Sequence, residues 1–275
     1  MKVATALAML RSGLTPDSIL PCTPTITVDG REFQNVPGYP ESSLGDIPLS
    51  EAIAHSCNTA MISQAGIVSQ EALHDAAADL GLGVVAPGLG VPAAYGSVPE
   101  TADGTAHAAA LIGQGEVVAS PLAMATLAAS VAAGHRVEPV LVRPAAQDTA
   151  QGAAQDPVQD ASEATPTDAA AEAPDTAGEA QVAPPNDLTP DEAAALHDLM
   201  RGVVTDGSGR ALADLPGDLA AKTGTAEHGE GSGVHAWMIA IQDDLAVAVM
   251  VEDGESGSGT AGPLLHDFLE AAAQG

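Results

Sequence analysis

Residues 219–251 read LAAKTGTAEHGEGSGVHAWMIAIQDDLAVAVMV, and this stretch decides the fold. Two short apolar runs, Trp237 to Ile241 and Leu245 to Val251, are joined by a polar Gln-Asp-Asp turn, a pattern that predicts a β-hairpin. The second run is continuously apolar, as expected for a strand that is covered on both faces. An apolar helical pattern over residues 263–273 follows, and this helix can cover one face of the sheet.

Upstream of this stretch the signals are mostly helical. The apolar spacing of Val3, Leu7 and Leu10 predicts an amphipathic helix where the sequence starts. Four further helices are predicted after the N-capping residues Ser50, Ser69, Ser120 and Thr189, and they cover residues 51–58, 70–80, 121–133 and 190–204. The first of these is expected to carry Ser56 to Asn58. Helices first and an antiparallel sheet later indicate an α+β fold.

Composition excludes several classes of function. The 275 residues suffice for one large domain or two small ones, and the formal net charge of -29 excludes a sequence-independent nucleic-acid binder. It also argues against docking on an anionic membrane surface. Two cysteines, Cys22 and Cys57, form neither a disulfide framework nor a zinc motif, although a single bridge between them is possible. We expect no metal and no cofactor.

One segment differs from the rest of the chain. Residues 144–186 are rich in Ala, Gln, Asp, Thr, Pro and Glu, with almost no large apolar residue and no lysine or arginine. Such a segment buries too little apolar surface to offset the entropy of ordering it. We therefore predict an acidic disordered insertion loop within one partial domain over residues 1–275. An interaction tail is the alternative interpretation.

Lys222-Thr223-Gly224-Thr225 precedes the predicted hairpin. On an edge strand, Gly224 would let another backbone approach closely, while Lys222 and Thr223 would supply a cation and a hydroxyl for a peptide carboxylate. A simple turn is the alternative for this short motif. The tetrapeptide is therefore a candidate binding site for an extended peptide.

Three other residues carry candidate chemistry. Ser56 and Asn58 interrupt an apolar helical pattern, where they could either cap a helix locally or relay protons and hold an amide in a cleft. Lys2 lies in the first turn of a predicted helix, where the helix dipole disfavours a cation. A lysine in such a place can have a lowered pKa and act as a general base.

Together these groups resemble the S-x-x-K, S-D-N and K-T-G motifs of penicillin-binding proteins and β-lactamases. The whole chain, apart from the acidic insertion, resembles the transpeptidase domain of class B penicillin-binding proteins, most of all the actinobacterial members. The segments that carry this resemblance are 2–7, 56–60, 112–116, 120–125, 222–228 and 235–237. A D,D-carboxypeptidase or a β-lactamase shares the three motifs, but the segment around Gly113 and the His-Ala-Trp strand at 235–237 favour the transpeptidase class.

The resemblance implies a role for each motif residue. Lys2 would activate the nucleophile, Ser56 would relay a proton to the leaving amine, and Asn58 would hold the substrate amide. The substrate carboxylate would bind at the third motif, at Lys222, Thr223, Gly224 and Thr225. The reaction implied is acyl transfer from the D-Ala-D-Ala end of a peptidoglycan stem peptide, and β-lactams would imitate that dipeptide.

With Lys2 as the motif lysine, the nucleophilic serine belongs three residues earlier, before Met1. We therefore expect an N-terminally truncated transpeptidase that lacks the first sheet strands, is poorly soluble and forms no covalent penicillin adduct. The alternative is a non-catalytic binding or scaffold relative in cell-wall synthesis.

The resemblance also implies partners and a location. Stem peptides and β-lactams are the expected ligands, and cell-wall synthesis or division proteins are possible partners. The full-length form would be anchored in the cytoplasmic membrane and face outward. This chain shows neither a signal peptide nor an apolar run long enough to span a membrane.

Overall fold

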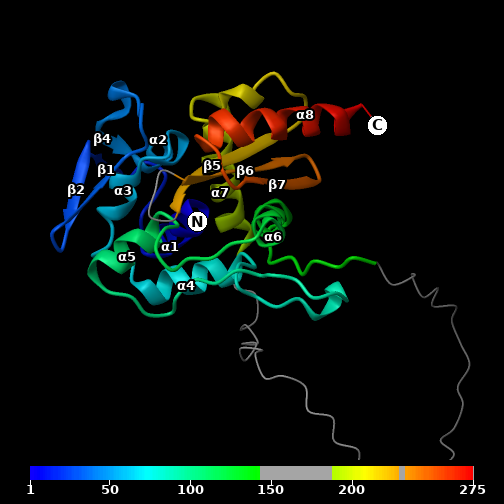
Figure 1. Cartoon of the computed structure of the whole chain (residues 1–275), viewed down its shortest axis with the longest axis horizontal. Coiled ribbons are helices and arrows are strands. Elements are labelled where there is room, and N and C mark those ends of the chain that lie inside the picture. Colours follow the sequence, from blue (N-terminus) through cyan, green and yellow to red (C-terminus); the bar gives the residue numbers. More distant parts are fainter. Residues whose placement is uncertain (143–187, 229–232, 275) are drawn as a thin grey trace, which may run out of the picture.

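The computed structural model describes residues 1–142, 188–228 and 233–274 (Figure 1). The predicted acidic loop over 144–186 lies outside the described residues. The helices are α1 (Lys2–Arg11), α2 (Leu49–Ala54), α3 (Asn58–Ile62), α4 (Gln70–Asp79), α5 (Gly104–Leu111), α6 (Pro121–Ala133), α7 (Pro190–Thr205) and α8 (Gly262–Ala273). The strands are β1 (Ile19–Cys22), β2 (Thr25–Val28), β3 (Arg31–Gln34), β4 (Gly45–Pro48), β5 (Leu219–His228), β6 (Gly233–Gln242) and β7 (Leu245–Val251).

The main sheet is an antiparallel meander in the order β5-β6-β7. The predicted hairpin is confirmed: Gln242 pairs with Leu245, and Asp243 takes a left-handed conformation with φ 53° in the two-residue turn between them. In this sheet β5, which carries residues 222–225, lies at one edge, so of the two alternatives for these residues the structure has the edge strand and not the simple turn. Two smaller antiparallel pairs, β1 with β4 and β2 with β3, lie beside α2 and α3.

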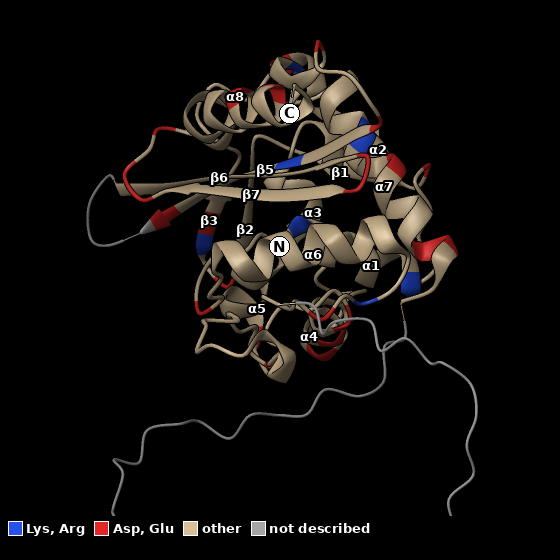
Figure 2. Ribbon diagram, turned by 90° about the vertical axis from the view of Figure 1, so that its right-hand side faces the viewer, with Lys and Arg blue, Asp and Glu red and all other residues tan. Residues whose placement is uncertain are grey.

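Helices cover both faces of the main sheet, which gives the predicted α+β architecture. In Figure 2, α8 lies on one face, α1 and α6 lie under the other, and α4 and α5 form the layer beyond them. Strand β7 contacts both α6 and α8, yet it is half-buried rather than fully buried, because it is an outer strand. The prediction that this strand is fully covered on both faces is therefore confirmed only in part.

Helix α1 corrects one prediction. An amphipathic helix was expected, but every residue from Lys2 to Met9 is buried. The helix passes through the largest hydrophobic cluster and packs against α4 and α7. The alanines at positions 4, 6 and 8 give its faces small side chains, so neighbouring elements can approach it on all sides. No helix within the described ranges is both long enough and apolar enough to cross a membrane.

Helix α2 corrects a second prediction. It begins at Leu49 after Pro48, and Ser50 is not its N-cap. The first backbone N–H groups are satisfied without a side chain, because Leu49 N–H donates to Ser18 O (2.9 Å) and Ser50 N–H to Pro16 O (3.0 Å). The helix ends before Ser56, which it was expected to carry.

The other capping predictions are confirmed. The hydroxyls of Ser69, Ser120 and Thr189 accept hydrogen bonds from the first turns of α4, α6 and α7, and Thr189 forms a capping box with Glu192.

Candidate active site

A cavity of about 350 Å³ lies between the start of α1, the α2–α3 corner and strand β5. All of the site residues predicted from the sequence line it, and they are Lys2, Ser56, Asn58, Lys222, Thr223, Gly224 and Thr225. The structure therefore brings together three motifs that are spread over more than two hundred residues of sequence.

Lys2 stands at the centre of one wall. Its Nζ atom donates to the backbone oxygen of Ser56 (2.7 Å), to Ser56 Oγ (2.8 Å) and to Asn58 Oδ1 (2.6 Å). The side chain is buried, and this desolvation, together with the charge of Lys222, lowers the pKa of Lys2 well below the usual value for lysine. A buried lysine of lowered pKa that contacts a hydroxyl is suited to proton transfer.

Ser56 owes its position to an unusual backbone. Its φ of 62° lies in the left-handed region, and its N–H donates to Ile53 O (3.1 Å) while Cys57 N–H donates to Ala52 O (2.8 Å). This pair of bonds is the Schellman motif, which closes α2 and usually has glycine at the left-handed position. A serine there supplies a hydroxyl at the cost of backbone strain, an arrangement found mainly at functional sites.

Asn58 is the first residue of α3, and both ends of its amide are engaged. Oδ1 accepts from Lys2, and Nδ2 donates to Gln34 O (2.8 Å) at the end of β3. The two bonds orient the side chain toward the cavity.

Strand β5 forms the opposite wall. Lys222 is buried, its Nζ atom donates to Thr223 O (3.1 Å), and burial lowers the pKa of its ammonium group to about 7. Thr225 Oγ1 accepts from Gly257 N–H (3.2 Å). Gly224 pairs with Trp237 on β6, and a Cβ atom at Gly224 would stand 3.1 Å from Trp237 Cβ. A glycine therefore suits this crowded point of the strand.

Sequence reasoning missed Ser208. Its hydroxyl lies 2.7 Å from Thr223 Oγ1, and its N–H donates to Ala54 O (2.9 Å) at the end of α2. A Cβ atom at the preceding residue, Gly207, would overlap the Ala54 carbonyl oxygen, so only glycine permits this approach. The Gly-Ser-Gly run at 207–209 is the one signal in the sequence for this turn.

The disulfide bond that the sequence allowed between its two cysteines is formed. Cys22 at the end of β1 is disulfide-bonded to Cys57, with the two Cα atoms 6.2 Å apart and both side chains buried. Because Cys57 stands between Ser56 and Asn58, the bond ties the second motif to β1.

The lysines of the chain are gathered at this cavity. The sequence has only two lysines, Lys2 and Lys222, and both line the cavity. In Figure 2 basic residues are few, and acidic residues lie on loops and on the outer turns of helices. Among the described residues, no group of His, Cys, Asp and Glu has the arrangement of a metal site.

Comparison with known proteins identifies a family and several relatives that agree with one another. Residues 1–270 match the family model described as penicillin binding protein transpeptidase domain. The peptidoglycan D,D-transpeptidase PbpA of Mycobacterium tuberculosis is 31% identical over 289 residues, covering 100% of this chain and 54% of the relative. The PbpA of Mycolicibacterium smegmatis is 31% identical over 290 residues, covering 98% of this chain and 53% of the relative.

A solved structure is also similar. Penicillin-binding protein A from M. tuberculosis, as a penicillin G acyl-enzyme complex, has a TM-score of 0.75 at 30% identity, covering 99% of this chain and 60% of that one. The chain spans about half the length of the curated relatives that it matches.

Proposed function

Because this chain belongs to the penicillin-binding protein transpeptidase family, we propose that its cavity is an acyl-transfer site for peptidoglycan stem peptides that end in D-Ala-D-Ala. One observation carries the proposal. Lys2 Nζ contacts Ser56 Oγ and Asn58 Oδ1 on one wall, and the third motif lies on the edge strand of the other. A base, a proton relay and a carboxylate site therefore surround one space.

The proposed chemistry follows from these groups. The neutral amine of Lys2 takes the proton of a serine hydroxyl, and that oxygen attacks the carbonyl of the penultimate D-alanine. Ser56 passes its proton to the departing nitrogen and takes the proton held by Lys2 in exchange, so the C–N bond breaks and D-alanine leaves as a neutral amine. Acyl transfer to a second amine then restores the serine.

Binding is assigned to β5. Lys222 and the hydroxyls of Thr223 and Thr225 would hold the terminal carboxylate, and the N–H of Thr225 would contribute to the oxyanion hole. The edge position of β5 supports binding of an extended peptide as an added strand. The family's nucleophile stands three residues before the motif lysine, a position that precedes residue 1 of the printed sequence. The predicted protein partners and membrane anchor stay predictions.

The test of this proposal adds a residue at the position of the nucleophile. Two chains are made, one with a leader that ends in Ser-Ala directly before Met1 and a matched one with a leader that ends in Ala-Ala. We expect penicillin G to add its full mass to the serine chain and to neither the alanine chain nor the 275-residue chain. A folded serine chain without the adduct, or an equal adduct on the alanine chain, would contradict the proposal.

A further inference from the structure

The start of α3 is capped by a side chain from outside the helix. The helix has only five residues, and its own N-cap residue, Cys57, offers a sulfur atom to Ala60 N–H at 3.4 Å. The first two backbone N–H groups of the helix donate to a residue other than this N-cap. Asn58 N–H (2.8 Å) and Thr59 N–H (3.2 Å) both donate to Oδ1 of Asn35, the residue that follows β3.

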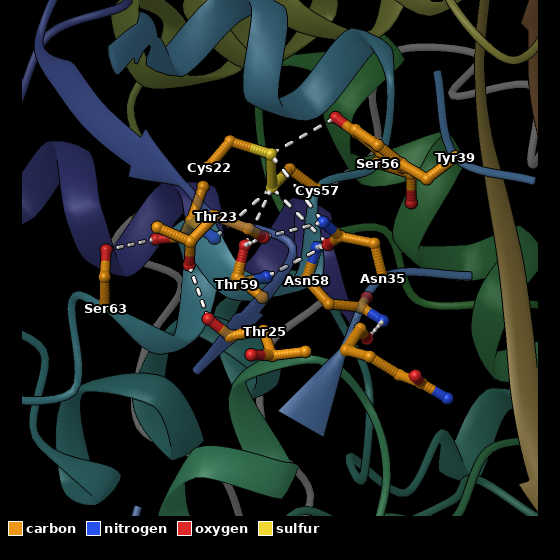
Figure 3. The surroundings of a disulfide bond; sticks show 12 residues. Cys22, Thr23, Thr25, Asn35, Tyr39, Ser56, Cys57, Asn58, Thr59 and Ser63 are labelled. Carbon is orange, nitrogen blue, oxygen red and sulfur yellow. Dashed lines mark hydrogen bonds between the residues drawn. A yellow bond between two sulfur atoms is a disulfide. The ribbon is translucent and has the colours of Figure 1, made fainter. Parts of the chain in front are cut away.

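Asn35 is itself held in one orientation. Its side chain is buried, and its Nδ2 donates to Thr23 O at 3.1 Å. Thr23 O also accepts from Thr59 Oγ1 at 2.7 Å, so the same carbonyl anchors both residues. Figure 3 shows Asn35, Thr23 and Thr59 gathered around the disulfide between Cys22 and Cys57. With N–H donors on one side and a carbonyl on the other, the amide of Asn35 cannot flip without losing bonds.

The disulfide does not replace this cap. It fixes Cys57 to β1, but it offers no oxygen to the backbone N–H groups of Asn58 and Thr59. A helix of five residues does not hold its shape alone, because nucleation costs more than so few hydrogen bonds return. The direction of the Asn58 side chain thus depends on what holds its backbone.

We propose that Asn35 is a positioning residue for the acyl-transfer site, because it fixes the backbone of Asn58 so that the side chain meets Lys2. The neighbouring residue completes the support, since Gln34 O accepts from Asn58 Nδ2. Residues 34 and 35 therefore hold both the backbone and the side chain of Asn58. The inference rests on the proposed function only for the roles of Lys2 and Asn58; the geometry stands apart from it.

The competing explanation is that Asn35 only stabilises α3. Both explanations predict that Asn35→Ala lowers the free energy of unfolding, so stability cannot separate them. They differ at Lys2. If the cap is purely structural, its removal leaves the surroundings of the Lys2 ammonium unchanged. If Asn35 is a positioning residue, its removal displaces Asn58 Oδ1, one of the three groups to which Lys2 Nζ donates.

The sequence allows this to be observed directly. Because Lys2 and Lys222 are the only lysines, a 275-residue chain with isotope-labelled lysine gives two side-chain NMR signals, one from each wall of the cavity. In Asn35→Ala we expect the Lys2 signal to shift and the Lys222 signal to stay. We also expect the amide protons of Asn58 and Thr59 to lose protection from hydrogen exchange. The control is Gln34→Ala, which removes an exposed side chain and keeps the backbone carbonyl.

Each outcome decides the inference. An unchanged Lys2 signal overturns it, and so do equal shifts of both lysines, which would indicate general loosening. If Asn35→Ala does not fold, Asn35→Asp retains an acceptor oxygen, and the two amide protons should stay protected; their exposure in that variant would also overturn it. Penicillin labelling of the serine-bearing chain tests acyl transfer without reference to Asn35, so the two proposals fail separately.

Discussion

The Nζ atom of Lys2 and the Oγ atom of Ser56 lie 2.8 Å apart, although 54 positions separate the two residues in the sequence. The contact depends on the left-handed backbone of Ser56, because that conformation closes α2 and turns the chain toward α1. The left-handed position that closes a helix is usually a glycine, and here it is a serine.

Replacing Ser56 with glycine and with alanine separates the hydroxyl from the backbone. Both variants remove one of the three acceptors of Lys2 Nζ, the Ser56 hydroxyl, but only alanine keeps a Cβ in the left-handed conformation. We expect Ser56→Gly to be more stable than Ser56→Ala by about 1–2 kcal/mol in urea unfolding, the cost of that conformation. Equal stabilities would show that the backbone at this position is not strained.

Stability is expected to depend on pH through Lys222. Its pKa is about 7 in the folded chain and near the usual 10.5 when unfolded, so between these values the unfolded chain binds more protons. The free energy of unfolding should therefore rise as the pH increases from about 7 to 10, by up to about 1.4 kcal/mol per pH unit for one such group. Lys2 acts in the same direction, because its pKa is also lowered.

The control for this slope is Lys222→Met, which keeps the length of the side chain and removes the titrating group. Urea unfolding at several pH values should give a shallower slope for the variant. A slope identical to that of the original chain would mean that Lys222 titrates normally in the folded state.

Binding of a carboxylate should take up protons. A peptide carboxylate beside Lys222 favours its charged form and so raises its pKa, which near neutral pH requires a proton from solution. Titration calorimetry with an N-acylated peptide ending in D-Ala-D-Ala, in two buffers of different ionisation enthalpy, measures this uptake. The peptide amide is the matched control and should bind more weakly with no uptake; equal binding of the two would argue against a carboxylate site at β5.

Removing the disulfide should destabilise the chain. The bond closes a loop of 35 positions, and loop-closure entropy assigns about 3–4 kcal/mol to a loop of that length. We expect Cys22→Ala combined with Cys57→Ala to lose an amount of this order in urea unfolding. The original chain unfolded and refolded with a thiol reductant should move toward the same stability, while a variant as stable as the oxidised chain would refute the structural role of the bond.

A single methyl group at Gly207 should disturb the turn that carries Ser208. The added Cβ overlaps the Ala54 carbonyl oxygen, which is backbone and cannot rotate away. We expect Gly207→Ala to lower the free energy of unfolding by about 1–3 kcal/mol, as overpacking typically does. Gly66→Ala is the control, because its Cβ meets nothing within 4 Å and the loss of chain entropy in the unfolded state should, if anything, stabilise that variant. Similar losses in both variants would show that the clash at Gly207 is not their cause.

The sequence predicted those features that depend on local pattern. The hairpin at residues 242–245 and the caps at Ser69, Ser120 and Thr189 follow from periodicity and turn chemistry within a few residues. For the KTG residues the sequence left an edge strand and a simple turn as alternatives, and the structure has the edge strand. The site residues were singled out by their local chemistry, and the resemblance to a known family joined Lys2, the Ser56–Asn58 segment and the KTG run into one site.

What the sequence did not predict depends on distant partners. Ser50 carries the usual signature of an N-cap, but carbonyl groups at residues 16 and 18 satisfy the start of α2 instead. Asn35 and Ser208 gain their importance only through groups more than a dozen positions away. The apolar spacing of α1 could not reveal a helix that is covered on every face by later elements.

The scarcity of lysine has a practical consequence for labelling this chain. Reagents such as succinimidyl esters, which decorate many surface lysines on most proteins, would find lysine amines here only within the cavity. A lowered pKa also leaves more of the Lys222 side chain in the nucleophilic, uncharged form near neutral pH. Coupling through lysine would therefore block the site instead of attaching the chain by its surface, and a small electrophile of this kind would serve as a covalent reporter of cavity access.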